Sequence, residues 1–305
     1  MPMSMLRHLL WLGALLSATL QVSALPTAQD LICNGHPEYC DRRYSELSFV
    51  GAHNSPFVGP LLQHNQDISV TEQLDFGIRF LQGQTHKNDD GVFSMCHTSC
   101  ILEDAGSVSS YLQTVKTWLD SHPNEVVTLL ITNGDGLDIK EFDDAFNAVN
   151  GIKDYTFAPK FKLALGDWPT LRELITTGKR LIVFVDSKAD TNRFPYLLDE
   201  FSYYFETPFS TTDENFPQCK LDRPAGGKPD GQMYLVNHTL NVNVFGIFLP
   251  DRFKADRTNA AVGQGSIGAQ VDLCNSIYHR KPNVVLVDFI TEGDVLKAER
   301  TMNGL

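Results

Sequence analysis

The feature that most constrains the fold is a series of short apolar runs that are hydrophobic on both faces. The clearest are "EVVTLLI" (125–131), "RLIVFV" (180–185) and "NVVLV" (283–287). A strand buried on both faces is typical of a parallel sheet that is covered by helices. Amphipathic segments lie between several of these runs, and the alternation of the two kinds of segment predicts an α/β fold with a parallel sheet.

Seven runs have the composition of strands, and three longer segments have helical periodicity. The expected strands are 47–54, 77–86, 91–97, 125–133, 180–187, 232–240 and 283–291. The expected helices are 107–123, 167–178 and 268–282, the second with Asp167 as its N-cap and Gly178 as its stop. No linker rich in Gly, Ser or Pro divides the chain, so residues 25–305 are expected to form a single domain.

Polar side chains stand at the end of each expected strand. They are His53 and Asn54, Gln82 and Gln84, His97, Thr132 and Asn133, Asp186, Asn237 and His238, and Asp288. In a (β/α)8 barrel the C-terminal ends of the strands converge on one mouth, where the active site lies. A Rossmann-type sheet also uses strand ends, but no G-x-G-x-x-G or P-loop motif follows the first strand. We therefore predict a distorted TIM-type (β/α)8 barrel with its active site at this mouth.

The first 24 residues have the pattern of a secretory signal peptide. A charged start at Arg7 and His8 precedes the apolar segment 9–20 and a small-residue cleavage site at 22–24. The protein is therefore expected to be secreted. Its net charge of -12 argues against nucleic acid as a partner and against tight adsorption to anionic lipid surfaces.

The cysteine count predicts a disulfide framework. Six cysteines follow the signal peptide, and sequence alone permits about 15 pairings of six. Short loops favour the pairs Cys33–Cys40 and Cys96–Cys100, which leaves Cys219 to pair with Cys274. A metal site formed around Cys96, His97 and Cys100 is the alternative, but an oxidising compartment favours disulfides. The sequence "NHT" also makes Asn237 an N-glycosylation acceptor.

Three motifs carry a family resemblance. "SFVGAHNS" (48–55), "LDFGIRFL" (74–81) and "GVFSMCHTSC" (91–100) resemble the X domain of phosphatidylinositol-specific phospholipase C, and the chain looks most like the secreted fungal phospholipase-C-like phosphodiesterases. The resemblance runs in order to "PNVVLVDF" (282–289) and implies a TIM-type barrel that cleaves phosphodiesters with two histidines.

The resemblance also implies residue roles. His53 would be the general base that removes the proton from the inositol 2-hydroxyl, and His97 the general acid that protonates the departing alkoxide. Asn54 occupies a position where the family carries Asp or Asn as a phosphate or metal contact. Asp288 matches an acid that orients the first histidine, and its alternative role is a cap for the following turn.

Gln82 and Gln84 depart from the family pattern. They match positions where metal-independent bacterial members resemble D-x-R and calcium-dependent animal members resemble E-x-D. Strand periodicity puts both glutamines on the face opposite Arg79, so Arg79 does not replace the missing charge. Neutral amides bind divalent cations poorly, so no cofactor is expected, and calcium and magnesium are both disfavoured.

Further substrate contacts are expected at the same mouth. The candidates are Asn54, Gln82, Gln84, His86, Asp186, Lys188 and Asn237. Lys188 has a solvated loop position as its alternative, and Asp186 a loop cap. Asn237 presents a conflict, because a glycosylated asparagine must be exposed whereas a residue of the mouth is enclosed. The aromatic cluster 201–207 is interpreted as core rather than as an apolar lip for lipid.

Three functions remain open on this reading. The first is a secreted, calcium-independent phosphodiesterase that acts as a monomer on a phospholipid or a glycerophosphoinositol-type small substrate, with transient contact with a membrane surface. The second is a catalytically weakened barrel that binds a sugar-phosphate or glycolipid. The third is a magnesium-dependent glycerophosphodiesterase or sphingomyelinase D-like enzyme, which the shortage of acids on the second strand disfavours.

Overall fold

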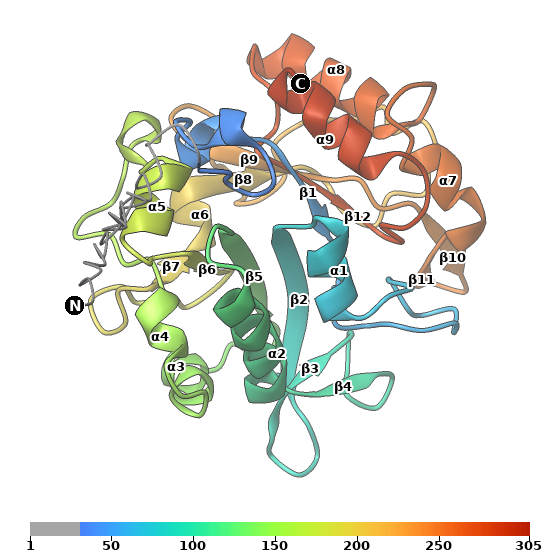
Figure 1. Cartoon of the computed structure of the whole chain (residues 1–305). Helices are drawn as coiled ribbons and strands as arrows, with labels where there is room; N and C mark the ends of the chain where they lie inside the picture. The colour runs from blue at the N-terminus through green and yellow to red at the C-terminus, as the bar shows by residue number, and fades with distance from the viewer. Residues whose placement is uncertain (1–30) are drawn as a thin grey trace, which may run out of the picture. The chain divides into compact units, whose positions relative to one another are not determined.

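Eight parallel strands form one curled sheet, around which the rest of the described chain is packed (Figure 1). A computed structural model describes residues 31–305, so the predicted signal peptide, 1–24, lies outside the described residues. The strands follow the order β7-β6-β5-β2-β1-β12-β9-β8, and every neighbouring pair in this order is parallel. Their bounds are β1 (Phe49–Ala52), β2 (Phe80–Lys87), β5 (Val127–Asn133), β6 (Leu181–Val185), β7 (Leu197–Asp199), β8 (Tyr204–Glu206), β9 (Met233–Asn237) and β12 (Val284–Val287).

The sheet is an open (β/α) barrel. Strands adjacent in the sheet are consecutive among the parallel strands of the chain, except that the first, β1, pairs with the last, β12, and this is the winding of a TIM barrel. Within residues 31–305, however, no ladder joins β7 to β8, and only the single-turn helix α6 (Glu200–Tyr203) connects them. The predicted α/β class and TIM-type barrel are confirmed, and the distortion lies at this opening.

Helices cover the outside of the sheet. They are α1 (Val70–Phe76), α2 (Val108–Ser121), α3 (Lys140–Asn147), α4 (Ile152–Tyr155), α5 (Leu171–Thr176), α7 (Ala255–Thr258), α8 (Ile267–Tyr278) and α9 (Val295–Asn303), with 3-10 turns at η1 (Pro37–Tyr39), η2 (Tyr44–Glu46), η3 (Leu165–Asp167) and η4 (Arg252–Lys254). Helix α2 buries the apolar face that its sequence predicts, namely Val108, Leu112, Val115 and Leu119.

The expected helix 167–178 begins later than its sequence suggests. Thr170, not Asp167, is the N-cap of α5, because the Thr170 hydroxyl accepts a hydrogen bond from the Glu173 backbone N–H and the Glu173 carboxylate accepts one from the Thr170 backbone N–H. Asp167 instead closes the 3-10 turn η3 by accepting a bond from the Ala164 backbone. The helix begins after Thr170 because the capping box there provides hydrogen-bond acceptors for two backbone N–H groups.

The run 91–97 is a strand, but the prediction of its place in the parallel sheet is wrong. After the turn at 88–91 the chain folds back, and β3 (Phe93–Cys96) pairs antiparallel with the far end of β2 and then with β4 (Asp104–Ser107). A turn of this length can join only antiparallel neighbours. The two shortest barrel strands, β7 and β8, are absent from the expected set because three residues give no periodic signal.

Two hydrophobic clusters hold the sheet in place. One lies between the sheet and its helices and includes Leu81, Leu129 and Val183; the other fills the barrel interior and includes Phe80 and Phe184. Strand alternation therefore directs Gln82, two residues after Phe80, toward the barrel interior. Tyr203, Tyr204 and Phe205 are buried, as the core interpretation expects, whereas Phe201 is half-buried.

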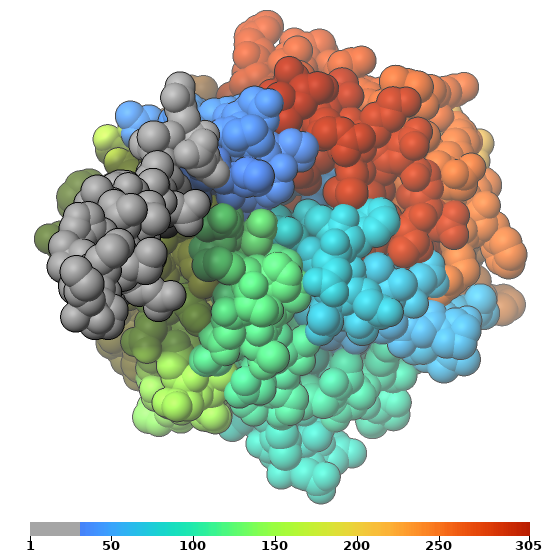
Figure 2. Space-filling model, viewed as in Figure 1, coloured from blue at the N-terminus to red at the C-terminus, as the bar shows by residue number. Residues whose placement is uncertain are grey.

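The two ends of the described chain meet. Asn303, at the end of α9, donates hydrogen bonds to the Ser48 backbone and the Tyr39 hydroxyl. In Figure 2 the C-terminal segment, in red, accordingly borders the segment that precedes β1, in blue. Among residues 31–305, no helix has the length and hydropathy needed to cross a bilayer.

All three expected disulfides are formed. They join Cys33 to Cys40, Cys96 to Cys100, and Cys219 to Cys274. Cys96 and Cys100 come within metal-binding distance of Asp104, but both thiols are used by their bond. The alternative metal site at 96–100 is therefore not formed.

Candidate active site

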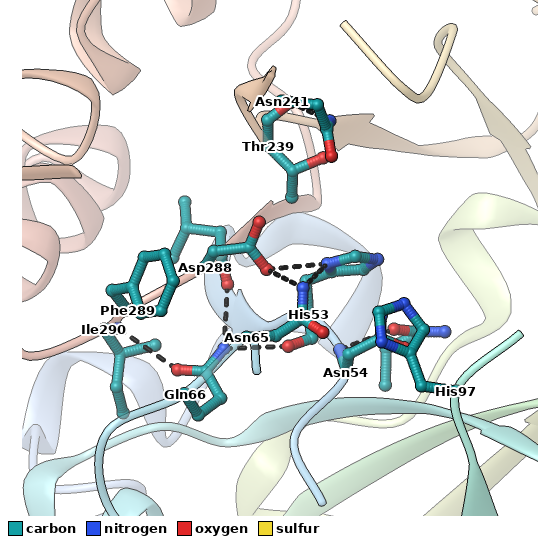
Figure 3. Close-up of polar contacts among 12 residues, drawn as sticks. His53, Asn54, Asn65, Gln66, His97, Thr239, Asn241, Asp288, Phe289 and Ile290 are labelled. Carbon is teal, nitrogen blue, oxygen red and sulfur yellow. Dashed lines mark hydrogen bonds and ion pairs between the residues drawn. The ribbon is translucent and has the colours of Figure 1, made fainter. Parts of the chain in front are cut away.

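His53 stands directly after β1 and is held by a carboxylate. Its Nδ1 lies 2.8 Å from Oδ1 of Asp288, the residue that follows β12, and the two side chains are 22% and 7% exposed (Figure 3). The carboxylate accepts the Nδ1 proton, so the lone pair of the neutral imidazole is on Nε2. This is the tautomer that a general base needs, and Asp288 has the orienting position that its motif predicts.

Two amides that the sequence analysis did not single out fix this pair. Asn65 donates from Nδ2 to Oδ1 of Asp288 at 2.8 Å. Gln66 donates from Nε2 to the backbone carbonyl of His53 at 2.8 Å and to that of Val287 at 3.1 Å. The two strand ends are thus joined through one loop (Figure 3). The dipeptide lies in an irregular segment between β1 and α1, where periodicity gives no signal.

The backbone turns sharply after each of the three principal side chains. Asn54, Thr98 and Phe289, which follow His53, His97 and Asp288, have φ values of 49°, 63° and 50°. The left-handed region is unfavourable for a β-branched or bulky residue, and such strain concentrates at functional sites. Because none of the three is glycine, the sequence alone does not reveal these turns.

His97 faces His53 across Asn54. Its Nε2 lies 3.2 Å from Nδ2 of Asn54 (Figure 3). Its ring stacks on Phe57, with centroids 5.1 Å apart. The disulfide Cys96–Cys100 closes the short loop that carries His97, which restricts the conformations of that loop. The structure therefore brings together both histidines, although His97 comes from the antiparallel extension rather than from a barrel strand.

The electrostatic environment of His97 favours its neutral form. Burial lowers the pKa of His97 to about 4, and the neighbouring His53 and His64 act in the same direction. The carboxylate of Asp288 and the backbone carbonyl of Gln63 raise it in part. A negative charge brought close to His97 would restore its proton.

Gln82 and Gln84 both use their side-chain oxygens to hold backbone. Oε1 of Gln82 accepts the Asn54 backbone N–H at 2.8 Å, and Oε1 of Gln84 accepts that of Thr98 at 3.1 Å. Each glutamine thus supports the residue that follows one histidine. Only the Nε2 groups remain to meet a substrate, as hydrogen-bond donors. Arg79 lies on the opposite face, where it pairs with Glu125 at 2.7 Å.

His86 and Lys188 are engaged by the loop after β5. His86 pairs through Nδ1 with Asp135 at 2.6 Å, and the Lys188 ammonium donates to the backbone carbonyl of Gly136. Neither side chain has a direct contact with His53 or His97 among the hydrogen bonds of the described residues. Their expected role in substrate binding stays a prediction.

Asp186 and Asn237 lie at the ends of β6 and β9. Asp186 accepts the Asn133 backbone N–H at 2.7 Å, and burial raises its pKa. Asn237 donates from Nδ2 to Glu206 at 3.0 Å, and Glu206 also pairs with Arg223. Glu206 and Arg223 are missing from the expected site, because one lies in an aromatic run and the other in an irregular loop.

The glycosylation of Asn237 is not compatible with this fold. Asn237 is 5% exposed, and its Nδ2, the atom that would carry the glycan, also donates to the Thr207 carbonyl at 2.9 Å. A glycan requires an exposed nitrogen. Its neighbour His238 is fully buried between Gln270 and the Thr258 carbonyl, so both residues of the pair are enclosed.

Comparison with known proteins places the chain among its relatives. The family described as PI-PLC X 1 matches residues 39–303. The PI-PLC X domain-containing protein 1 of Arthroderma benhamiae is 97% identical over all 305 residues of both chains. An uncharacterized secreted protein of the same fungus is 45% identical over 272 residues, which are 86% of this chain and 61% of that protein.

A solved structure shows the same fold. The phosphatidylinositol-specific phospholipase C from Listeria monocytogenes matches with a TM-score of 0.59 and 16% identity, over 87% of this chain and 95% of the bacterial chain. At this identity the likeness supports the barrel architecture.

Proposed function

The chain belongs to the PI-PLC X family, and on this premise we propose that it is a phosphodiesterase acting on a phosphatidylinositol-type lipid or its glycerophosphoinositol headgroup. The observation that carries the proposal is the pair of histidines at the barrel mouth. His53 has a free Nε2 and a carboxylate behind it, and His97 stands opposite across Asn54. One group is built to take a proton and the other is placed to give one.

The first step uses His53. Nε2 removes the proton from the inositol 2-hydroxyl, and the resulting oxygen attacks phosphorus to form a cyclic phosphodiester. Asp288 stabilises the imidazolium that forms, because its Oδ1 accepts the Nδ1 proton throughout. The base is therefore held in one tautomer and one orientation.

The same step needs a proton for the leaving group. The bond between phosphorus and the lipid oxygen breaks, and protonated His97 gives a proton to the alkoxide that departs. Burial lowers the pKa of His97 to about 4. The anionic phosphodiester brings a negative charge beside the imidazole, so substrate binding itself promotes the protonated form.

Stabilisation of the transition state comes from neutral donors. The amide nitrogens of Asn54, Gln82 and Gln84 are the groups offered to the phosphoryl oxygens. Loss of one preorganised donor typically costs about 10²- to 10³-fold in rate, and a cation contributes more than an amide. We expect slower turnover than in an enzyme with an arginine at this place.

We propose that the reaction does not require calcium. A calcium site needs several free oxygen ligands, with carboxylates preferred. Gln82 and Gln84 stand where acids would be needed, and both of their oxygens are already bonded to backbone N–H groups. The same donor set gives a magnesium-dependent mechanism no support.

A cluster of polar residues near the two histidines could bind the headgroup of the substrate. Asp186, Glu206 and Asn237 follow or end parallel strands, so they point to the same mouth, and Arg223 pairs with Glu206. Carboxylates, an amide and a guanidinium suit the hydroxyls and phosphates of an inositol headgroup.

An apolar rim around the mouth fits transient contact with a lipid surface. Its exposed side chains belong to the loops after β1 and β3 and to the hairpin β10 (Asn241–Val244)–β11 (Ile247–Pro250) that follows β9. We define the rim as Leu61, Leu62, Ile101, Leu102, Val244, Phe245, Ile247 and Phe248. The hairpin contains no charged residue, so contact would be hydrophobic rather than electrostatic.

Secretion and a monomeric state complete the proposal. The three disulfides fit an oxidising compartment, and a relative in Arthroderma benhamiae is described as secreted.

The alternative function is that of a catalytically weakened barrel that binds a sugar-phosphate or glycolipid. The neutral Gln82 and Gln84 favour this alternative because they supply hydrogen bonds without charge.

A direct assay tests the proposal. The purified protein is incubated with phosphatidylinositol, glycerophosphoinositol and phosphatidylcholine, with calcium or with a chelator. We expect cyclic inositol phosphate from the first two in both conditions, and a fall of about 10²- to 10⁴-fold in His53→Ala and His97→Ala. His279→Asn is the control. His279 is an exposed residue at the end of α8, and its backbone has the left-handed conformation, which asparagine tolerates. No cleavage of any diester, with inositol phosphate still bound, would favour the alternative.

A further inference from the structure

Glu103 is a buried carboxyl beside His97 for which the mechanism above has no role. It follows the loop that the Cys96–Cys100 disulfide closes, and its side chain is 10% exposed. Its Oε2 has no hydrogen-bond partner, and neither has Nδ1 of His97. These two buried, unpartnered atoms face each other at 3.9 Å. A buried polar atom without a partner is costly, so two such atoms in apposition indicate a shared proton or a contact that closes during function.

The other oxygen of Glu103 is fixed by His64. Nδ1 of His64 accepts the Leu61 backbone N–H at 3.0 Å, so its proton is on Nε2. That Nε2 donates to Oε1 of Glu103 at 3.2 Å. Oε1 is therefore occupied, and Oε2 is left pointing at His97. Gly59 makes the arrangement fit, because a Cβ there would come within 2.5 Å of the His64 ring.

We propose that Glu103 is the positioning residue for the general acid: Oε2 holds Nδ1 of His97, so that Nε2 presents a proton to the departing alkoxide. This inference rests on the proposed function. Asn54, which contacts Nε2, is neutral. The carboxyl that directly faces the imidazole of His97 across Nδ1 is therefore Glu103. The charged and titratable groups around His97 are Glu103 together with His53, His64 and Asp288.

The proton follows a balanced path. Burial raises the pKa of Glu103 to about 7, whereas burial lowers that of His97 to about 4, so near neutral pH the pair holds one proton. Nε2 of His97 accepts a hydrogen bond from the Asn54 amide, so the proton of the neutral imidazole is on Nδ1. When the anionic substrate arrives, Glu103 releases its proton to solvent and Nε2 of His97 takes one up, which leaves a carboxylate that accepts the Nδ1 proton of an imidazolium. Nε2 then gives its proton to the alkoxide, and His97 is left neutral.

A titration of His97 by NMR tests the inference without turnover. The resonances are identified by their loss in His97→Ala. In the wild-type protein we expect a His97 transition near pH 7, from the shared proton, and a second one at lower pH. In Glu103→Gln only the lower transition should remain. Asp104→Asn, which removes an exposed charge from the next residue, should keep both. The buried His238 serves as an internal check of folding.

Kinetics with two leaving groups provides the second arm. Inositol phosphodiesters with an alkyl or a nitrophenyl leaving group differ in their need for a general acid. Glu103→Gln should lower kcat/KM about 100-fold on the alkyl ester and less than about fivefold on the nitrophenyl ester. An unchanged His97 titration, or equal losses on both esters, would overturn the role of Glu103. If the wild-type protein cleaves neither ester, the proposed function fails, and the titration still decides this inference.

Discussion

At the scale of single residues, the site depends on which atom of each polar group is already occupied. Asp288 fixes the tautomer of His53, and the oxygens of Gln82 and Gln84 are taken by backbone N–H groups. A sequence shows that an amide is present, but the bonding in the folded chain decides that only its nitrogen is free. The two histidines also differ in their partner atoms. His53 is bonded to a carboxylate, whereas His97 contacts the neutral amide of Asn54 and faces a carboxyl oxygen that has no hydrogen-bond partner.

The substitution Asp288→Asn tests the orienting role of this carboxylate. An amide nitrogen at this place would donate to Nδ1 of His53, which moves the imidazole proton to Nε2 and removes the base. We expect kcat to fall on the order of 10²- to 10⁴-fold with little change in KM. Steady-state kinetics measures the effect, and Asp294→Asn, an exposed acid after the same strand, is the control. An unchanged kcat would mean that Asp288 serves only as a cap.

At the scale of elements, a strand or helix can be predicted correctly from the sequence while its pairing partner or the burial of its residues is not. The run at 93–96 is a strand, yet it lies antiparallel on β2 outside the barrel, which brings His97 over the mouth from one side. Helix α9 shows a similar dependence. Its Glu299 is buried against β1 and accepts the Val50 backbone N–H at 2.7 Å, so a charged residue type stands inside the core.

The buried Glu299 predicts a loss of stability as pH rises. Burial raises its pKa to about 7, above the value in the unfolded chain, so the folded state binds this proton more tightly. The contribution is fully present below about pH 4.5 and is lost as pH rises through about 7, up to about 3 kcal/mol in total. We expect Glu299→Gln to reduce the fall in the unfolding free energy between pH 5 and 8.

Urea unfolding at several pH values measures this slope. Glu103, whose pKa burial also raises to about 7, contributes with the same sign, so the slope in Glu299→Gln should shrink rather than vanish. Glu292→Gln, an exposed residue before the same helix, is the matched control for charge removal. An identical slope in wild type and Glu299→Gln would contradict the assignment.

At the scale of the whole molecule, the open barrel gathers distant loops at one mouth. The loops after β1, β3 and β9 are separated along the chain, yet they are tied together by the His64–Glu103 and Arg252–Asp67 pairs. Their apolar tips form the rim defined above. No stretch of the sequence marks this rim, because its members are dispersed and each alone is an ordinary exposed hydrophobic residue.

The rim predicts binding to uncharged membranes. Replacing Phe245 and Ile247 with serine should weaken binding to phosphatidylcholine vesicles by at least about tenfold, since each side chain loses apolar burial. Binding of the wild type should change little with salt, because the hairpin is uncharged and the chain carries a net charge of -12. Vesicle sedimentation measures both. Phe161→Ser is the control, an exposed phenylalanine in the segment after Thr156, which pairs with the start of β6. Binding that requires anionic lipid would refute the hydrophobic mode.

The sequence by itself determined the class of the fold, because strands that are apolar on both faces and alternate with amphipathic segments are typical of a parallel sheet covered by helices. It also indicated the two histidines, Asp288 and the disulfide pairs. Short-range pattern is sufficient for these, since each depends on residues close in the chain or on a motif of fixed spacing. Only the tertiary structure decided the places of Asn65, Gln66, Glu103 and Arg223, the burial of Asn237 and the side from which His97 approaches. Those depend on the paths of irregular loops, whose contacts join residues far apart in sequence and are set by backbone hydrogen bonds that no local pattern encodes.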